Sequence, residues 1–385
     1  MNLYLRFFFL LTIPFSLILS ACERQNDARQ TGQNSRNVSS QKQTPTAAEN
    51  SGFVYTADER GNSISVINLA SGEVRKIPIS VSPHNVQISN DGRLLLVVGA
   101  PAAGGGHSHD KEGEKNDEAG GHTEHKNDGG HGGSPGKVLI FDAGKMDSGE
   151  APAEVEVGRH PAHVVIDTQG RFIYATNSED DTISVIDVAQ KKVVKTIATG
   201  KFPHGLRMSP DGREIYTANT GDGTVSVISA AEQKEVARIP VGKAPVQVGF
   251  TPDGRRVYVS LRDENAVAVV DTAARQKIAS VPVGSQPIQI FAAPGGRFVY
   301  VANQGTESNP DNTVSVIDTG SHQVAATVTV GKGAHGVVAS PDGSRVFIAN
   351  TFDDTVSVID AATQKVVGTI AVGDAPNGIT YGSAM

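Results

Sequence analysis

A turn glycine recurs at a fixed interval along most of this chain. It stands at Gly170, Gly212, Gly254 and Gly296, which are 42 residues apart (170 to 212, 212 to 254, 254 to 296), in turns such as Ser209-Pro210-Asp211-Gly212-Arg213. Self-similarity at this spacing is typical of solenoids and propellers, in which each copy buries its apolar face only against a neighbouring copy. This repeat constrains the fold more than any other feature.

Each repeat contains four short segments in which apolar and polar residues alternate. In one copy they cover residues 205–208, 214–218, 224–228 and 235–241, separated by turn residues. A two-residue period over such lengths predicts strands rather than helices. Four strands, named a to d outward from an axis, predict one antiparallel propeller blade for each repeat.

The two ends of the repeat region complement each other. Residues 53–57, 63–68 and 73–79 match strands b, c and d with no strand a before them, and residues 377–381 supply one strand a at the other end. We therefore predict an all-β, seven-bladed β-propeller of four-stranded antiparallel blades, closed by N-terminal strands b, c and d together with C-terminal strand a. Such closure removes exposed sheet edges.

Several copies of strand b share one pattern, and each is followed by Thr-Val-Ser-Val-Ile. These copies are Tyr216-Thr217-Ala218-Asn219, Tyr300-Val301-Ala302-Asn303 and Phe347-Ile348-Ala349-Asn350. The pattern resembles the YVTN-family β-propeller repeat over about residues 53 to 381. The resemblance implies the propeller fold and says little about chemistry, because similar propellers include surface proteins, binding proteins and enzymes.

The N-terminal segment has the pattern of an export signal. An apolar run from Phe7 to Leu19 follows Arg6, is too short to span a bilayer and ends in Leu19-Ser20-Ala21-Cys22. It resembles a bacterial lipoprotein signal, which implies lipidation of Cys22, the chain's one cysteine. An ordinary cleaved signal with an incidental cysteine is the alternative. Both predict an exported protein, and the lipid predicts a membrane anchor at the periplasmic face of the outer membrane or at the cell surface.

Composition divides the chain and excludes several functions. We predict a signal peptide at residues 1–21, a polar, flexible tether at 22–50 and the propeller at 51–385. A net charge of -7 disfavours nucleic acid as a partner. A single cysteine excludes intrachain disulfides and thiolate metal cages.

The second blade carries an insertion at about residues 101–136, between strands b and c. The segment is rich in glycine and acidic residues and contains five histidines, His107, His109, His122, His125 and His131. Neutral imidazole suits zinc, copper and nickel, so we predict metal binding here. A solvated low-complexity spacer is the alternative.

Blade topology gathers ten of the eleven histidines on one face of the propeller. The insertion carries five of these ten, and only His322 lies on the opposite face. The connections from d to a carry the other five, namely His84, His160, His163, His204 and His335. We predict that all of these except His160 ring the channel mouth and hold zinc or copper with a position left open. The alternative is that the Pro-His pair simply recurs in these connections and that neighbouring groups satisfy each ring without metal. Carboxylates such as Asp180 and Asp222 share this face and either attract cations or cap turns.

These features support three classes of function. The leading hypothesis is a lipid-anchored extracytoplasmic binding protein that captures or transfers a divalent transition metal, a layout that resembles exported zinc metallochaperone propellers with a His-rich segment. The second is a metal-dependent hydrolase. The third is a protein-interaction scaffold without metal function, which would bind a protein partner on the histidine-bearing face.

Overall fold

The computed structural model describes residues 52–102, 133–146 and 148–383, which all belong to one compact unit, Pro45–Met385. Some predictions concern residues outside these ranges. They are the signal peptide at 1–21, lipidation at Cys22, the tether at 22–50 and metal binding by His107, His109, His122, His125 and His131.

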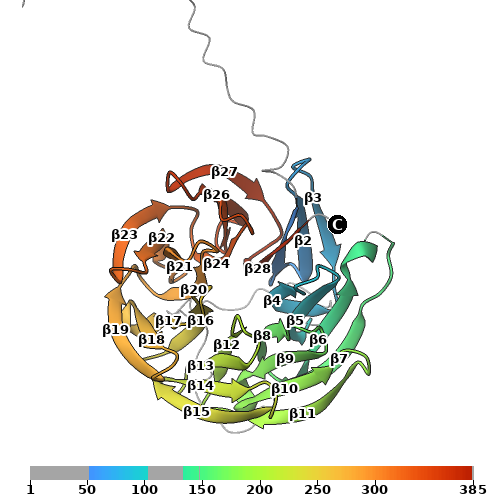
Figure 1. Cartoon of the computed structure of the whole chain (residues 1–385). Helices are drawn as coiled ribbons and strands as arrows, with labels where there is room; N and C mark the ends of the chain where they lie inside the picture. The colour runs from blue at the N-terminus through green and yellow to red at the C-terminus, as the bar shows by residue number, and fades with distance from the viewer. Residues whose placement is uncertain (1–51, 103–132, 147, 384–385) are drawn as a thin grey trace, which may run out of the picture. The chain divides into compact units, whose positions relative to one another are not determined.

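The described strands form seven four-stranded antiparallel sheets, which confirms the predicted fold (Figure 1). Each sheet is one blade. The innermost strands of the blades contact one another in the cyclic order β4, β8, β12, β16, β20, β24, β28 and back to β4. The ring of blades is therefore closed.

Seven strand sets make up the blades, from innermost to outermost strand. Blade 1 is β28 (Pro376–Gly382), β1 (Phe53–Asp58), β2 (Ser63–Asn68) and β3 (Val74–Pro78). Blade 2 is β4 (Val81–Ile88), β5 (Leu94–Pro101), β6 (Pro135–Asp142) and β7 (Ala153–Arg159). Blade 3 is β8 (Pro161–Ile166), β9 (Phe172–Asn177), β10 (Thr182–Asp187) and β11 (Lys192–Ala198). Blade 4 is β12 (Pro203–Met208), β13 (Glu214–Asn219), β14 (Thr224–Ser229) and β15 (Lys234–Pro240). Blade 5 is β16 (Pro245–Phe250), β17 (Arg256–Leu261), β18 (Ala266–Asp271) and β19 (Gln276–Pro282). Blade 6 is β20 (Pro287–Ala292), β21 (Phe298–Gly305), β22 (Pro310–Asp318) and β23 (Gln323–Thr329). Blade 7 is β24 (Ala334–Ala339), β25 (Arg345–Asn350), β26 (Thr355–Asp360) and β27 (Lys365–Ala371).

Blade 1 joins the two ends of the propeller. Strand β28 pairs antiparallel with β1, with Phe53 opposite Gly382 and Thr56 opposite Ile379. The closure therefore uses one C-terminal strand and three N-terminal strands, as predicted.

The hydrophobic core lies between neighbouring blades. In one cluster Tyr216 and Val225 of blade 4 pack with Val257 and Val270 of blade 5. The β-branched residues of the repeat fill these interfaces because one face of each strand turns toward the next blade. The turn glycines Gly170, Gly212 and Gly254 each have a φ of 70°, in the left-handed region that glycine adopts without steric cost.

A buried polar network ties strand b to strand c in most blades. The Nδ2 of Asn219 donates 2.9 Å hydrogen bonds to the hydroxyls of Thr224 and Ser226, five and seven residues later. Equivalent asparagines are Asn177, Asn303 and Asn350. Blade 1 has Asp58 there instead, and it accepts hydrogen bonds from Ser63 and Ser65.

Short 3-10 segments are the helical elements that the described residues contain. They are η2 (Ala143–Lys145), η3 (Ser178–Asp180) and η4 (Arg262–Glu264). Across the described ranges, none of the helices has the length and apolarity that a membrane crossing requires.

Candidate metal centre

Four of the predicted histidines lie on inner strands, each on a different blade. His84 is on β4, His163 on β8, His204 on β12 and His335 on β24. We expected them in the connections before strand a, but the strands begin earlier and include them. All four are buried, with at most 7% of their surface exposed.

Three of these imidazoles form a compact cluster. His84, His163 and His204 each offer a ring nitrogen, and these nitrogens all lie within 4.8 Å of one another. The Nε2 atoms of His84 and His204 are 3.2 Å apart. The ring of His335 lies at the edge of the cluster, with its centroid 6.4 Å from that of His84. The histidines predicted to gather from separate repeats are thus brought together.

Backbone carbonyls orient the rings of His204 and His335. The Nδ1 of His204 lies 3.2 Å from the carbonyl oxygen of Val246, and the Nδ1 of His335 lies 3.0 Å from that of Asn377. A carbonyl only accepts, so Nδ1 is the donor in both rings. In the neutral form, the Nε2 of each ring then carries the lone pair that a metal needs.

His84 and His163 have amide groups at Nδ1 instead. The Nδ2 of Asn377 lies 3.4 Å from His84, and the Nε2 of Gln247 lies 3.2 Å from His163. The orientation of the Gln247 amide follows from its oxygen, which accepts a 2.9 Å hydrogen bond from the backbone N–H of Val248. Because an amide nitrogen donates, the neutral rings of His84 and His163 carry their proton on Nε2. The Nε2–H of His84 then donates to the Nε2 of His204.

Small residues let the inner strands approach closely enough for these contacts. A Cβ atom on Gly336, the residue after His335, would lie 2.5 Å from the carbonyl oxygen of Asn377. That oxygen is the acceptor of the His335 ring. Glycine is therefore required beside this histidine because any side chain would push the acceptor away.

Sequence reasoning missed Glu59 as part of this site. Its Oε1 lies 3.6 Å from the Nδ1 of His84, and its Oε2 accepts a hydrogen bond from the Nδ2 of Asn377. The signal was a carboxylate at a position where three other blades place a hydroxyl that donates to the proline carbonyl of the next blade, as Ser178 does to Pro203, Thr220 to Pro245 and Thr351 to Pro376. The remaining three blades have Ala100, Arg262 and Gln304 there.

Other polar residues on this face have local structural roles. Asp180 accepts hydrogen bonds from the backbone and side chain of Arg159, and Asp222 accepts one from the backbone N–H of Lys201. These carboxylates cap connections between blades, so capping is the role that their contacts support. His160 is exposed and its Nδ1 lies 3.9 Å from Glu179. It lies apart from the cluster, as predicted.

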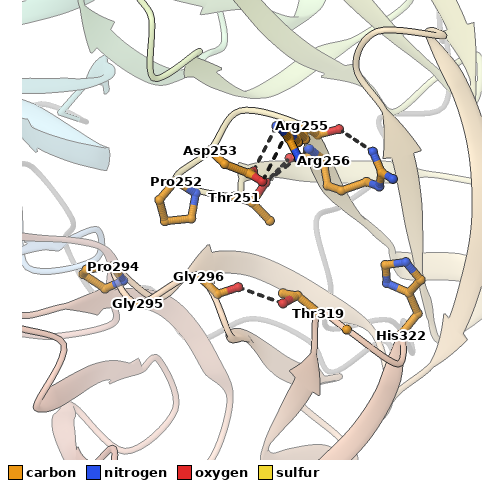
Figure 2. Close-up of a pocket in the computed structure, with 11 residues that line it drawn as sticks. Thr251, Pro252, Asp253, Arg255, Arg256, Pro294, Gly295, Gly296, Thr319 and His322 are labelled. Carbon is orange, nitrogen blue, oxygen red and sulfur yellow. Dashed lines mark hydrogen bonds and ion pairs between the residues drawn. The ribbon is translucent and has the colours of Figure 1, made fainter.

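A separate pocket of about 580 Å³ lies among the a-to-b turns of blades 5 and 6 and a c-to-d turn (Figure 2). His322 borders it, and its Nδ1 lies 2.9 Å from the hydroxyl of Tyr258. Arg256 also borders it and pairs with Asp271 at 2.6 Å. Because these groups already hold neighbouring strands together, this pocket is a weaker candidate than the histidine cluster.

The cluster spacing suits a tetrahedral metal ion. Zinc binds imidazole nitrogen at about 2.0–2.1 Å, which puts two ligand nitrogens of a tetrahedral site about 3.3–3.4 Å apart. The His84 and His204 nitrogens, at 3.2 Å, are close to that spacing. Three histidine ligands leave the fourth position for solvent or another ligand.

Fold and site together define a seven-bladed propeller with a buried imidazole cluster at the inner ends of its blades. The chain belongs to the YNCE-like beta-propeller family, whose model matches residues 151–343. No curated protein matches the chain.

Solved structures share the fold at low sequence identity. Hydrazine synthase of Kuenenia stuttgartiensis is 20% identical with a TM-score of 0.60, covering 77% of this chain and 88% of its own. A protein of unknown function from Desulfotomaculum acetoxidans DSM 771 is 17% identical with a TM-score of 0.66, covering 87% and 100%. A putative 6-phosphogluconolactonase from Bacteroides uniformis ATCC 8492 is 15% identical with a TM-score of 0.64, covering 86% and 99%. These likenesses show the fold alone.

Proposed function

We propose that this protein binds a divalent transition metal, zinc or copper, through His84, His163 and His204. One observation carries the proposal: three buried imidazoles from three blades place ligand nitrogens within 4.8 Å of one another. Neutral imidazole is a preferred ligand of both metals.

His335 and the insertion extend this proposal. His335 stands beside the three ligands with its Nδ1 already donating to a carbonyl, so its Nε2 is a candidate fourth ligand. His107, His109, His122, His125 and His131 would collect the ion before the cluster holds it. The layout supports capture or transfer of metal by an exported binding protein.

The cellular setting is part of the same proposal. The signal-like segment ending at Cys22 supports a lipid-anchored protein at the periplasmic face of the outer membrane or at the cell surface. The resemblance to the YVTN-family repeat and to exported zinc metallochaperone propellers agrees with this setting. A protein partner on the histidine-bearing face would receive or supply the metal.

Calorimetric titration of the tag-free full-length protein with zinc and with copper tests the proposal. We expect one high-affinity site that is lost in the His84→Ala plus His204→Ala variant and kept when residues 103–132 are deleted. High-affinity binding that disappears with the deletion and survives the double substitution would assign the metal to the insertion instead. Heat of binding that neither change alters would refute the cluster as a metal site.

A metal-dependent hydrolase is a second candidate, supported by the position that three histidine ligands leave open. The propeller titled a putative 6-phosphogluconolactonase suggests a lactone as the first substrate to assay. Zinc-dependent lactone hydrolysis that disappears in the His204→Ala variant would favour catalysis. Stoichiometric metal binding without turnover would favour capture.

A further inference from the structure

Glu59 stands at a position that varies between the blades, and its carboxylate lies beside the metal ligand His84. Where blades 4 and 7 use the hydroxyls of Thr220 and Thr351 to join neighbouring blades, blade 1 has a carboxylate. The backbone of Glu59 still makes the joining contacts, since its N–H donates to Ala375 and its carbonyl accepts from the hydroxyl of Ser82. Its side chain points to His84 instead.

The hydrogen bonds around His84 require a change when a metal binds. With its proton on Nε2, His84 donates to His204 and accepts at Nδ1 from the amide of Asn377. A metal on Nε2 displaces that proton, and the ring stays neutral because a proton is taken up at Nδ1 by exchange with solvent, so no net proton is released. The ring then donates from Nδ1 and needs an acceptor there.

Glu59 is the acceptor that the structure provides. Its Oε1 is 3.6 Å from the Nδ1 of His84, so an approach of about 0.6 Å would give a hydrogen bond of ordinary length. Asn377 already donates to the other carboxylate oxygen, which holds the side chain toward the ring. A carboxylate behind a metal-binding histidine fixes ring orientation and increases ligand basicity.

We propose that Glu59 is a positioning residue that holds His84 with its Nε2 toward the metal. This inference rests on the proposed metal binding by His84. It also makes the site depend on ring closure, because Glu59 and Asn377 come from opposite ends of the propeller and meet only when β28 pairs with β1.

The zinc affinity of four full-length proteins tests the proposal: wild type, Glu59→Gln, His84→Ala and the double variant. Affinity is measured by competition with a chromophoric chelator at pH 7. Glu59→Gln should bind zinc 10- to 100-fold more weakly than wild type, about the range found when outer partners of metal ligands are removed. In the His84→Ala background the same substitution should change affinity less than about 2-fold, because a residue that acts through His84 loses its effect with it.

Two further variants separate positioning from other effects. Glu59→Thr restores the residue type of blades 4 and 7 and should weaken zinc binding as Glu59→Gln does while keeping the unfolding midpoint of the metal-free protein. Glu264→Gln removes an exposed carboxylate of the same face, one that accepts from the backbone N–H of Lys243, and should leave zinc affinity within about 2-fold of wild type.

Each outcome distinguishes the two proposals. Wild-type affinity in Glu59→Gln, or an equal loss with and without His84, would overturn the positioning role and leave the metal site standing. A wild-type protein that binds no zinc would overturn both.

Discussion

Zinc should stabilise this propeller by joining three blades, and loss of one ligand should remove most of that effect. The His84 and His204 nitrogens already stand at 3.2 Å, and the third ligand nitrogen lies no more than 4.8 Å from either. A tetrahedral site therefore requires His163 to move inward by at most about 1.5 Å. The cluster is nearly formed before metal arrives, so little of the binding free energy goes into rearrangement.

The expected stabilisation follows from binding linkage. Zinc at a thousand times its Kd stabilises the folded state by about 4.1 kcal/mol. Unfolding entropy near 2.1 cal/mol/K per residue gives a body of roughly 330 residues about 0.7 kcal/mol/K, so the Tm should rise by about 6 °C. His204→Ala removes one of three ligands. A 100-fold weaker Kd would cut the stabilisation by about 2.7 kcal/mol and leave a rise of about 2 °C.

Thermal unfolding followed by circular dichroism, with and without zinc, measures these shifts. The quantity compared is the zinc-induced rise within each variant, so the Val246 contact that His204→Ala also removes cancels out. The insertion histidines are present in every protein compared. His322→Ala, on the opposite face, is the matched control and should keep the full rise. Equal rises in wild type and His204→Ala would refute the reasoning.

Three further predictions concern the body that holds the site. Burial raises the pKa of Asp58 above its ordinary value of 3.8, so the folded state binds the proton more tightly than the unfolded chain does. The stability of the wild-type protein is therefore lost as the pH rises from below 3.8 through the raised pKa of the folded state. Asp58→Asn should therefore be more stable than wild type to urea at pH 7, by a margin that shrinks toward pH 3.5; a less stable variant at pH 7 would contradict this. Desolvation lowers the pKa of Arg207 to about 10, and no described carboxylate compensates it, so Arg207→Met should increase the urea midpoint at pH 7 by the equivalent of about 1–3 kcal/mol. An unchanged or lower midpoint would show that the guanidinium is well solvated. Asn219→Ala removes the hydrogen bonds to Thr224 and Ser226, worth about 1 kcal/mol each, and should lower the Tm by about 3 °C in calorimetry, whereas a shift below 1 °C would mean that they contribute nothing.

Much of the site could be predicted because the repeat carries spatial information. A residue at one position of a 42-residue repeat lies at one height around the axis in every blade, so His84, His204 and His335 were expected near one another. His163 stands one residue further along its repeat and still joins the cluster. The choice of three close ligands and one peripheral ring could not be made from spacing, since it depends on ring rotations and ångström-scale distances.

The partners of the rings were also beyond sequence reasoning. Val246 and Asn377 act through backbone carbonyls, which every residue has, so no residue type marks them. Glu59 is 25 residues from His84 and belongs to another blade. Only the packing of blade 1 against β4 shows that its carboxylate reaches the ring.

The sequence alone determined the strands, the blade number and the closure of the ring. These follow from local alternation, turn chemistry and a count of repeats, which short segments of chain record directly. Tertiary structure decided which imidazoles share a site and which nitrogen of each ring faces it. Those properties arise from contacts between residues of different blades that are about 42 or more positions apart in the sequence, such as the contact between the Nδ1 of His204 and the carbonyl of Val246. No local sequence pattern encodes the geometry of such contacts.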